Sequence, residues 1–455
     1  MIAIEKRETE GRETEGKGSL YRMLWRWHFY AGLICIPFVI WLALTGTIYL
    51  FRPQIDAWVD RDMAVLQRTG TPATQQAIVN AATSAVPGST FAGIMLAEQP
   101  DQAARVLVSD HGVSTRIYVH PDTLAILKTV DEGGTWDRWI FKLHGELMMG
   151  TAGSIMVELA ASWAIVMVVT GLYLWWPRNA RGLAGVIYPR IGQGAKRFWR
   201  DIHAVTGVWV SAFALFLLSS GMPWALVWGN GFKMVREATG TAAISQDWVI
   251  GPQSDHAGHG EHGGGPDMAP VDHSAHGGAT VDQIVTRATA LNLAAPVILT
   301  PPTKSAPYWW AKSNAQNRPQ REDVAFNAMT GEVARRDIFD QKHIIDQVVG
   351  VAIAAHEGQL FAPLNQILGV LTALGLVTLC VSAFVMWRRR APEGVLGAPP
   401  PIPDARIGAG LAVIIVIAGL LLPVLGASLI GLAVLERLVL RHWKPARRWL
   451  GLKIV

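Results

Sequence analysis

The sequence predicts an α-helical integral membrane bundle of six spans, four of them in a duplicated pseudo-twofold core, with two small α+β domains on its outer face. Three observations lead to this fold class. The 455-residue chain is 51% hydrophobic and only 16% charged, so it is too apolar for an ordinary soluble protein. Several apolar runs are long enough to cross a bilayer, and one pattern of histidines and glycines occurs twice.

Four uninterrupted apolar runs cover approximately residues 29–50, 155–176, 204–228 and 361–387. At ~1.5 Å per helical residue, each run can cross the ~30 Å hydrocarbon layer. A fifth run, 408–435, is broken by Pro423 and Gly426, so it is either one long tilted helix or a hairpin of two short ones. Both of its flanks are basic, which favours the hairpin and gives six spans.

Basic residues fix the expected orientation, because short basic loops stay in the cytoplasm. The N-terminal segment, the Arg388–Arg390 cluster and the tail after Glu436 are basic. The loop between the second and third runs contains Arg178, Arg181, Arg190, Lys196, Arg197 and Arg200. We therefore expect a multi-pass protein of the bacterial inner (cytoplasmic) membrane, in contact with membrane lipid, with both termini cytoplasmic. The net charge of +5 is an orientation signal and predicts no nucleic-acid partner.

The chain divides into eleven predicted segments. In order they are a disordered cytoplasmic tail (1–20), span 1 (21–51), outer domain 1 (52–140), an interfacial helix with span 2 (141–178), a basic cytoplasmic loop (179–200), span 3 (201–228), outer domain 2 (229–350), an interfacial helix with span 4 (351–390), a cytoplasmic linker (391–406), the hairpin of spans 5 and 6 (407–440) and a basic cytoplasmic tail (441–455).

Each outer domain is predicted to contain a helix followed by strands of alternating hydrophobicity. In the first, TPATQQAIVNAATSAV is the helix, with Thr71 or Thr74 as its N-cap, and FAGIMLA, ARVLVSD and TRIYVHPDTLAILK follow. In the second, TVDQIVTRATALN precedes APVILT, APYWWAKS and EDVAFNAMTGEVARR. The unit of helix, outer domain and helix therefore occurs twice, with the copies related by an axis along the membrane normal.

Four histidines form two matched pairs in this duplication. His28 and His203 are each followed by a glycine at the fourth and at the eighteenth residue, namely Gly32 and Gly46 in the first copy and Gly207 and Gly221 in the second. His144 and His356 are each followed by a tryptophan at residue 31 and an arginine at residue 34, namely Trp175 and Arg178, and Trp387 and Arg390.

Equivalent residues near a pseudo-twofold axis can face each other across it, so we expect His28 with His203 on the cytoplasmic side and His144 with His356 on the outer side. Paired intramembrane histidines are the usual ligands of b-type haem, which predicts two bis-histidine haem b groups and an electron path across the membrane. Taken alone, each histidine also fits a polar residue at the lipid interface. The matched offsets favour ligands. The glycines either allow close helix packing or make room for a porphyrin.

The same residues limit the type of haem protein. His144 lies in WIFKLHGELMM, which is separated from span 2 by Gly150 and Gly153 and is predicted to be an interfacial helix of its own. The chain has no C-x-x-C-H motif, which excludes covalent c-type haem attachment, and it has no dinucleotide-binding fingerprint. A quinol or a cytoplasmic donor must therefore supply the electrons.

A separate His-rich loop occupies residues 255–278 of outer domain 2. It contains His256, His259, His262, His273 and His276 among many glycines. This spacing suits loose binding of copper, zinc, nickel or iron, and it lacks the rigid framework of a catalytic site. Trp309 and Trp310 follow in the same domain, where core or interface packing is the expected use and stacking on an aromatic chelate is the alternative.

The assembled motifs resemble the PepSY-associated transmembrane family. The matching stretches are WRWHFYAGL, VELAASWAIVMVVTGLYLWWPR, RDIHAVTGVW and HEGQLFAPLNQILGV, and the resemblance covers about residues 20–440. It implies that both outer domains are PepSY-like periplasmic domains, with PDT and MTGEV at the expected turn. It also implies haem b at His28, His144, His203 and His356, and the activity of an inner-membrane ferric-siderophore reductase in iron uptake. The His-rich loop is not part of the family pattern, which leaves the metal open between iron and copper.

Three functions are compatible with these residues. The first is a transmembrane reductase of a periplasmic ferric chelate. The second is a non-enzymatic permease for a metal, a chelate or haem, which would need polar residues in the spans; few are present, namely Glu158, Thr45, Ser162, Thr170, Ser219, Ser220 and Asn365. The third is a PepSY-type regulatory or metal-binding membrane protein, which leaves the matched histidines unexplained. We favour the reductase.

Overall fold

The computed structural model describes residues 2–177, 182–242, 278–303, 306–401 and 407–452, with side chains from residue 19 onward. The chain forms two compact units. The first, the helical unit, comprises residues 1–47, 144–232 and 368–455, and the second, the sheet unit, comprises residues 48–143 and 233–367. The predicted metal ligands His256, His259, His262, His273 and His276 lie outside the described residues.

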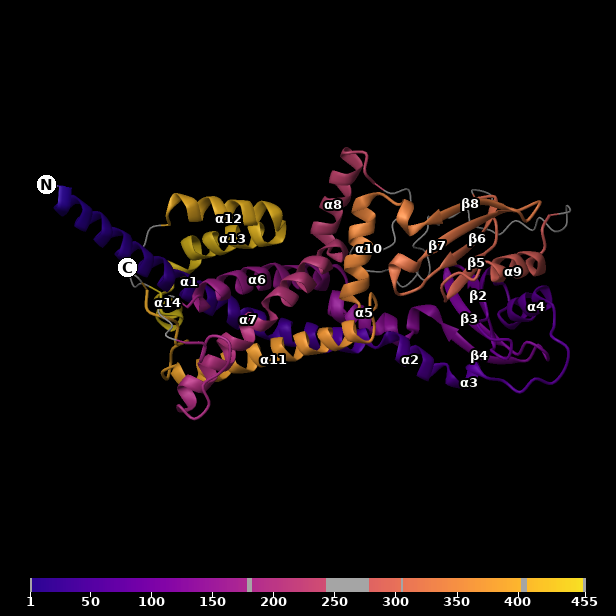
Figure 1. Cartoon of the computed structure of the whole chain (residues 1–455), viewed down its shortest axis with the longest axis horizontal. Helices are drawn as coiled ribbons and strands as arrows, with labels where there is room; N and C mark the ends of the chain where they lie inside the picture. Colours follow the sequence, from indigo (N-terminus) through magenta and orange to yellow (C-terminus); the bar gives the residue numbers. More distant parts are fainter. Residues whose placement is uncertain (1, 178–181, 243–277, 304–305, 402–406, 453–455) are drawn as a thin grey trace. The chain divides into compact units, whose positions relative to one another are not determined.

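The helical unit confirms a multi-span membrane bundle. Five helical segments among the described residues are long and apolar enough to cross a membrane, namely Ser19–Leu50, Thr151–Trp175, Ala195–Trp224, Leu364–Arg390 and Pro423–Leu440. The helices that provide them are α1 (Ile2–Leu50), α6 (Thr151–Trp175), α7 (Ala195–Gly221), α11 (Leu364–Arg390) and α13 (Pro423–Leu435), and α14 (Lys444–Leu450) follows (Figure 1).

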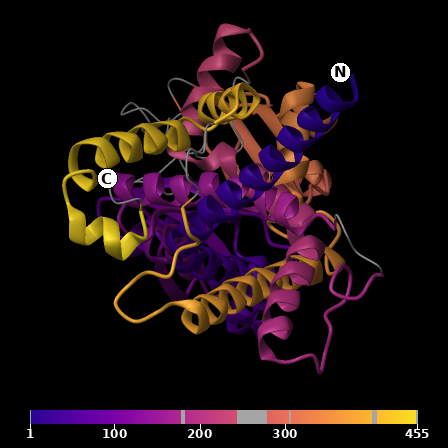
Figure 2. The same cartoon turned by 90° about the vertical axis from the view of Figure 1, so that its left-hand side faces the viewer.

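The fifth apolar run forms the predicted hairpin. Helix α12 (Ala409–Leu421) packs beside α13, and the chain reverses at Leu422 and Pro423 (Figure 1 and Figure 2). The backbones approach closely, because a Cβ on Gly426 would lie 2.6 Å from the Gly419 carbonyl oxygen. Helix α12 has 13 residues, or ~20 Å at ~1.5 Å per residue, and is too short for a full span. The sixth predicted span is therefore a shorter helix.

Two boundaries in this unit differ from those expected. The segment 1–20 was expected to be disordered, but from residue 2 onward it continues α1 without a break. Its many glutamate, arginine and lysine residues have high helix propensity, and adding a turn to an existing helix avoids the cost of nucleation. The third span was expected to reach residue 228 but ends at a short 3₁₀ turn, Met222–Trp224, because Pro223 cannot continue the helical hydrogen bonds. Helix α8 (Leu226–Ala238) follows it.

The sheet unit contains one antiparallel sheet of eight strands in the order β4-β3-β2-β1-β5-β6-β7-β8. The strands are β1 (Thr90–Met95), β2 (Ala104–Asp110), β3 (Val113–Val119), β4 (Ile126–Asp131), β5 (Val297–Thr300), β6 (Tyr308–Ser313), β7 (Glu322–Asn327) and β8 (Val333–Ile338). The helices are α2 (Arg52–Val59), α3 (Arg61–Ala64), α4 (Gln75–Ala85), α9 (Val281–Ala290) and α10 (Ile344–His356), and α5 (Trp136–Glu146) starts in this unit. The predicted order of one helix and then strands, repeated twice, is confirmed.

The two predicted outer domains are not separate bodies. Strand β1 of the first repeat pairs with β5 of the second, with Ile94 opposite Leu299 and Met95 opposite Ile298. An edge strand exposes unpaired backbone groups, and joining two four-stranded halves removes one such edge from each. Alternating hydrophobicity predicts strands but does not reveal which edges pair, so the sequence could not show this junction.

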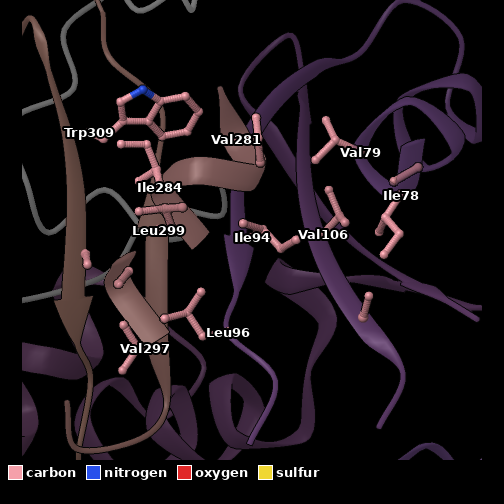
Figure 3. Packing of buried hydrophobic residues seen from close by; sticks show 14 of the residues in the cluster. Ile78, Val79, Ile94, Leu96, Val106, Val281, Ile284, Val297, Leu299 and Trp309 are labelled. Carbon is pink, nitrogen blue, oxygen red and sulfur yellow. The ribbon is translucent and has the colours of Figure 1, made fainter. Parts of the chain in front are cut away.

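A single hydrophobic core holds α4 and α9 on the sheet. Ile78 and Val79 of α4 and Ile284 of α9 pack with Ile94, Val106 and Leu299 of the strands (Figure 3). Trp309 belongs to this core and is 6% exposed, with its ring centre 6.4 Å from that of Phe91. The expected core role of Trp309 is therefore confirmed.

Helix α4 begins at its predicted N-cap, and the second repeat supports the same turn. The Thr74 hydroxyl accepts a hydrogen bond from the Ala77 backbone N–H. Asp282 of α9 accepts hydrogen bonds from the backbone N–H groups of Gln75 and Gln76, at 2.6 and 3.3 Å. A carboxylate at a helix N-terminus satisfies unpaired donors and complements the helix dipole.

Substituting Asp282 by Ala should therefore loosen the contact between the two repeats. We expect a loss of about 1 kcal/mol in the stability of the sheet unit and faster amide exchange in the first turn of α4. Hydrogen–deuterium exchange on the full chain in detergent measures this directly. Asp62→Ala, on an exposed side chain, is the control; equal exchange in both variants would contradict the proposed support.

Candidate functional site

The structure brings His28 and His203 together. His28 lies on α1 and His203 on α7, and both belong to the helical unit. The centres of their imidazole rings are 6.5 Å apart, and the ring planes are nearly perpendicular, at 87°. Two helices that are far apart in the sequence therefore present one imidazole each to a common point, as the matched offsets predicted.

Hydrogen bonds from neighbouring helices fix the orientation of both rings. The His203 Nδ1 lies 3.1 Å from the Leu379 carbonyl oxygen and 3.1 Å from the Ser382 Oγ, both on α11. A carbonyl oxygen can only accept, so the Nδ1 of His203 carries the proton. Its Nε2 then has a free lone pair, which is the form of histidine that binds a metal.

The same argument assigns the proton on His28. Its Nδ1 lies 3.0 Å from the Thr170 Oγ1 on α6. Thr170 donates its only hydroxyl proton to the Val166 carbonyl oxygen, at 2.7 Å, so its oxygen accepts from the histidine. His28 therefore also has a protonated Nδ1 and a free Nε2 lone pair. A hydrogen bond that fixes the tautomer of a ligating histidine is a regular feature of metal sites.

His144 repeats this arrangement on another helix. It lies near the end of α5, and its Nδ1 is 2.9 Å from the Thr45 Oγ1 on α1. Thr45 donates its own proton to the Trp41 carbonyl oxygen at 2.8 Å. His356 is the last residue of α10 in the sheet unit. The pairing of His144 with His356 remains a prediction from the sequence.

The predicted separation of α5 from the second span is confirmed. The chain leaves α5 through a turn in which Leu147, Met148 and Gly150 all have positive φ. Gly153 then packs so closely that a Cβ would lie 1.6 Å from the Glu146 carbonyl oxygen. No side chain fits there, so the two glycines noted in the sequence belong to a backbone-to-backbone turn. This turn lets His144 sit on its own helix.

The matched glycines have different uses. A Cβ on Gly46 would lie 3.1 Å from the His144 Cε1, so this glycine makes room for the imidazole ring. Gly171 does the same for His28, at 3.2 Å. Gly32 and Gly207 instead face side chains of neighbouring helices, which is the packing alternative.

The hydroxyl groups that bond these histidines were not predicted from the sequence, although their spacing was repeated in it. Thr45 and Ser220 both follow their histidine, His28 or His203, by 17 residues. Thr170 and Ser382 both follow theirs, His144 or His356, by 26 residues. The duplication therefore includes small hydroxyl residues as well as histidines. Thr45 and Thr170 had been noted only as polar residues of a transport path.

The residues of the first pair fit a haem. Two imidazoles on opposite sides of one metal ion, with bonds of about 2 Å, place their ring centres roughly 6 Å apart. The observed 6.5 Å agrees with this spacing. Among the described residues, no group of three or more histidine, cysteine or acidic side chains could hold a metal ion by itself. A two-histidine site suits a centre that brings its other ligands with it, as a porphyrin does.

Two further polar residues of the spans, Glu158 and Asn365, have structural partners. Glu158, 2% exposed on α6, accepts hydrogen bonds from the backbone N–H groups of Val227 and Trp228 at the start of α8. Asn365 bonds the Ala355 carbonyl oxygen and the Leu360 N–H. These groups close helix ends, and a buried carboxylate with two donors is not a free transport residue.

The fold and the paired histidines define a multi-pass membrane protein with a candidate cofactor site between spans. The sequence signature described as the PepSY-associated TM region matches residues 25–390, most of the chain. The chain therefore belongs to the PepSY-associated transmembrane family, as its motifs predicted. The comparison with curated proteins found no match.

The hydroxyl partner of His28 provides a test of the site that needs no cofactor. Thr170→Val keeps the shape of the side chain but leaves the His28 Nδ1–H without its acceptor. We expect a loss of about 1–3 kcal/mol, seen as a lower apparent unfolding temperature of the purified protein in detergent. The matched control is Thr378→Val on α11, whose exposed hydroxyl bonds only the Leu374 carbonyl oxygen of its own helix. Equal losses in both variants would contradict the assignment.

Proposed function

We propose that this chain is an inner-membrane di-haem b reductase that passes electrons across the membrane to a periplasmic ferric siderophore or another metal chelate. The observation that carries the proposal is the first pair, in which His28 and His203 approach to 6.5 Å with both δ nitrogens already bonded. The second pair, His144 and His356, is included in the proposal because its offsets match and because His144 forms an equivalent hydrogen bond with Thr45.

The residues of the chain have defined roles in this proposal. The histidines hold the cofactor through Nε2, and Thr170, Ser382 and Thr45 keep each ring in the required tautomer and orientation. The apolar helices keep water away from the centre, which affects its reduction potential. Bound haem b supplies a centre that exchanges one electron at a time. The electrons come from a quinol or a cytoplasmic donor.

The proposed reaction needs no acid or base from the protein. One electron converts Fe(III) of the chelate to Fe(II), and the hard oxygen ligands of such chelates hold Fe(II) less tightly. Release of the metal then follows from the change in charge. The absence of a catalytic triad in the sequence is therefore compatible with reductase activity.

The alternative functions receive less support from the contacts. A permease would use the polar span residues, but Glu158 closes the start of α8 and both threonines bind histidines. A regulatory role of the PepSY type does not require imidazoles inside a helical bundle with their δ nitrogens held by hydrogen bonds. The reductase accounts for both observations.

Haem content tests the proposal. Protein purified in detergent from haem-replete cells should show a low-spin b-type spectrum after reduction, and pyridine haemochrome quantitation should give about two haems per chain. His28→Ala and His144→Ala should each lose about one haem, because each removes one axial ligand. His442→Ala, in the basic C-terminal segment, is the control and should lose none. A colourless preparation would disprove the cofactor assignment.

Electron transfer is tested separately in proteoliposomes. With a quinol in the membrane, the wild type should reduce Fe(III) nitrilotriacetate outside the vesicles, measured with an Fe(II)-specific dye. His28→Ala should reduce it at no more than the rate of empty vesicles, since the path is broken at its first centre. Two haems without Fe(III) reduction would retain the cofactor assignment and disprove the reductase.

A further inference from the structure

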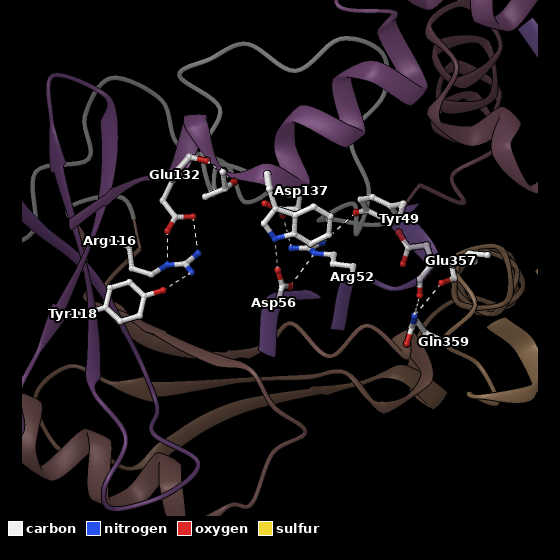
Figure 4. Close-up of polar contacts among 12 residues, drawn as sticks. Tyr49, Arg52, Asp56, Arg116, Tyr118, Glu132, Asp137, Glu357 and Gln359 are labelled. Carbon is white, nitrogen blue, oxygen red and sulfur yellow. Dashed lines mark hydrogen bonds and ion pairs between the residues drawn. The ribbon is translucent and has the colours of Figure 1, made fainter. Parts of the chain in front are cut away.

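The junction between α1 and α2, residues 49–56, contacts two separate parts of the sheet unit (Figure 4). Arg52 is the first residue of α2, and its guanidinium points toward Tyr49 and Asp137. The proposed function gives no role to these residues. They are relevant because one of the elements they contact is α5, the helix that carries His144.

One set of contacts runs from this junction to the start of α5. The Arg52 Nη2 lies 2.8 Å from the Asp137 Oδ2, and the Arg52 Nη1 donates to the Tyr49 hydroxyl at 3.1 Å. The Trp136 Nε1 donates to the Asp56 Oδ1 at 2.9 Å. Trp136 and Asp137 are the first two residues of α5, and His144 follows Asp137 by seven residues, two helical turns along the same face.

A second set of contacts runs to the segment directly after His356. The Leu50 carbonyl oxygen, at the end of α1, accepts from the Gln359 Nε2 at 3.1 Å and from the Gln366 Nε2 at 2.8 Å. Gln366 is 3% exposed and also bonds Gln54. A Cβ on Gly358 would lie 2.8 Å from the Leu50 Cδ2, so the Gly358 backbone packs closely against the Leu50 side chain.

The charges at the junction favour a fixed arginine. Burial acts to lower the pKa of Arg52, but Tyr49 and the carboxylates of Asp137, Asp56 and Glu357 outweigh it and hold the pKa above its ordinary value. The Arg52 Nε has no hydrogen-bond partner among the described residues. A planar guanidinium can contact Tyr49 and Asp137 at once through two of its nitrogens, which a lysine ammonium cannot reproduce.

We propose that Arg52 is a positioning residue for His144, a proposed ligand of the second haem, because it fixes the start of α5, the helix that carries this histidine. This inference rests on the proposed function, since it assumes that His144 and His356 are ligands. Neither residue would ligate the metal; Arg52 would act through α5, and Gln366 would act by holding the junction that contains Arg52. Loss of the junction should affect the second haem and leave the first unchanged.

The test separates the two haems with ligand variants. His28→Ala leaves only the second haem, and His144→Ala leaves only the first. In the His28→Ala background, Arg52→Gln should weaken haem retention roughly 10-fold and alter the low-spin EPR signal, as loss of an outer-shell support does. In the His144→Ala background the same substitution should change neither. Arg52→Lys should restore part of the retention. Gln366→Met, which removes the contact from the other side, should repeat the Arg52→Gln result.

The control is Arg68→Gln, which removes a bidentate pair with Asp122 elsewhere in the sheet unit and should leave both haems intact. Unchanged retention for Arg52→Gln in the His28→Ala background would overturn the inference while the wild type still holds two haems. Equal loss in both backgrounds would also overturn it, because it indicates general unfolding. A wild type without haem would disprove the proposed function itself, and this inference with it.

Discussion

The hydrogen bonds at the δ nitrogens of His28, His144 and His203 are the interactions on which the candidate site depends. An imidazole inside an apolar bundle has two polar atoms, and an unpaired N–H there is costly. The hydroxyls of Thr170 and Thr45 accept the hydrogen bond of the imidazole N–H, because each donates its own proton to a carbonyl of its own helix. The oxygen is then left only as an acceptor, so the backbone of α1 or α6 determines which histidine nitrogen keeps the proton. The opposite nitrogen then keeps a free lone pair, as the proposed ligand role requires.

These bonds also connect the spans. His28 links α1 to α6, His144 links α5 to α1, and His203 links α7 to α11. Helices in lipid gain little from the hydrophobic effect and depend on close packing and interhelical hydrogen bonds. The residues proposed to hold the cofactor therefore stabilise the bundle before any cofactor binds. A site formed in this way is already organised, so binding does not have to supply the cost of ordering these five helices.

The sequence was sufficient for five of the six predicted membrane spans, the repeat and the approach of His28 to His203, because apolar length and duplicated offsets depend on local pattern alone. The eight-stranded sheet was missed, since the pairing of β1 with β5 depends on which edges meet in space. The helical form of residues 2–20 was missed because charged composition does not reveal an adjacent helix that can be extended. Thr45 and Thr170 were seen as polar span residues, and only the geometry showed that they face histidines.

The two repeats differ in the residues around their histidines, and this difference affects the surroundings of His28 and His203. In the first repeat, Thr170 is the hydrogen-bond partner found for His28, and Gly171 makes room for the ring. In the second, His203 reaches both Ser382 and the Leu379 carbonyl oxygen, and alanine stands at position 383, where the first repeat has glycine. The δ proton of His203 therefore has two acceptors, whereas one is found for that of His28. A stronger acceptor at Nδ1 makes Nε2 a better electron donor. The two imidazoles of the first pair therefore have unequal surroundings at Nδ1, and they would hold the proposed cofactor as unequal ligands.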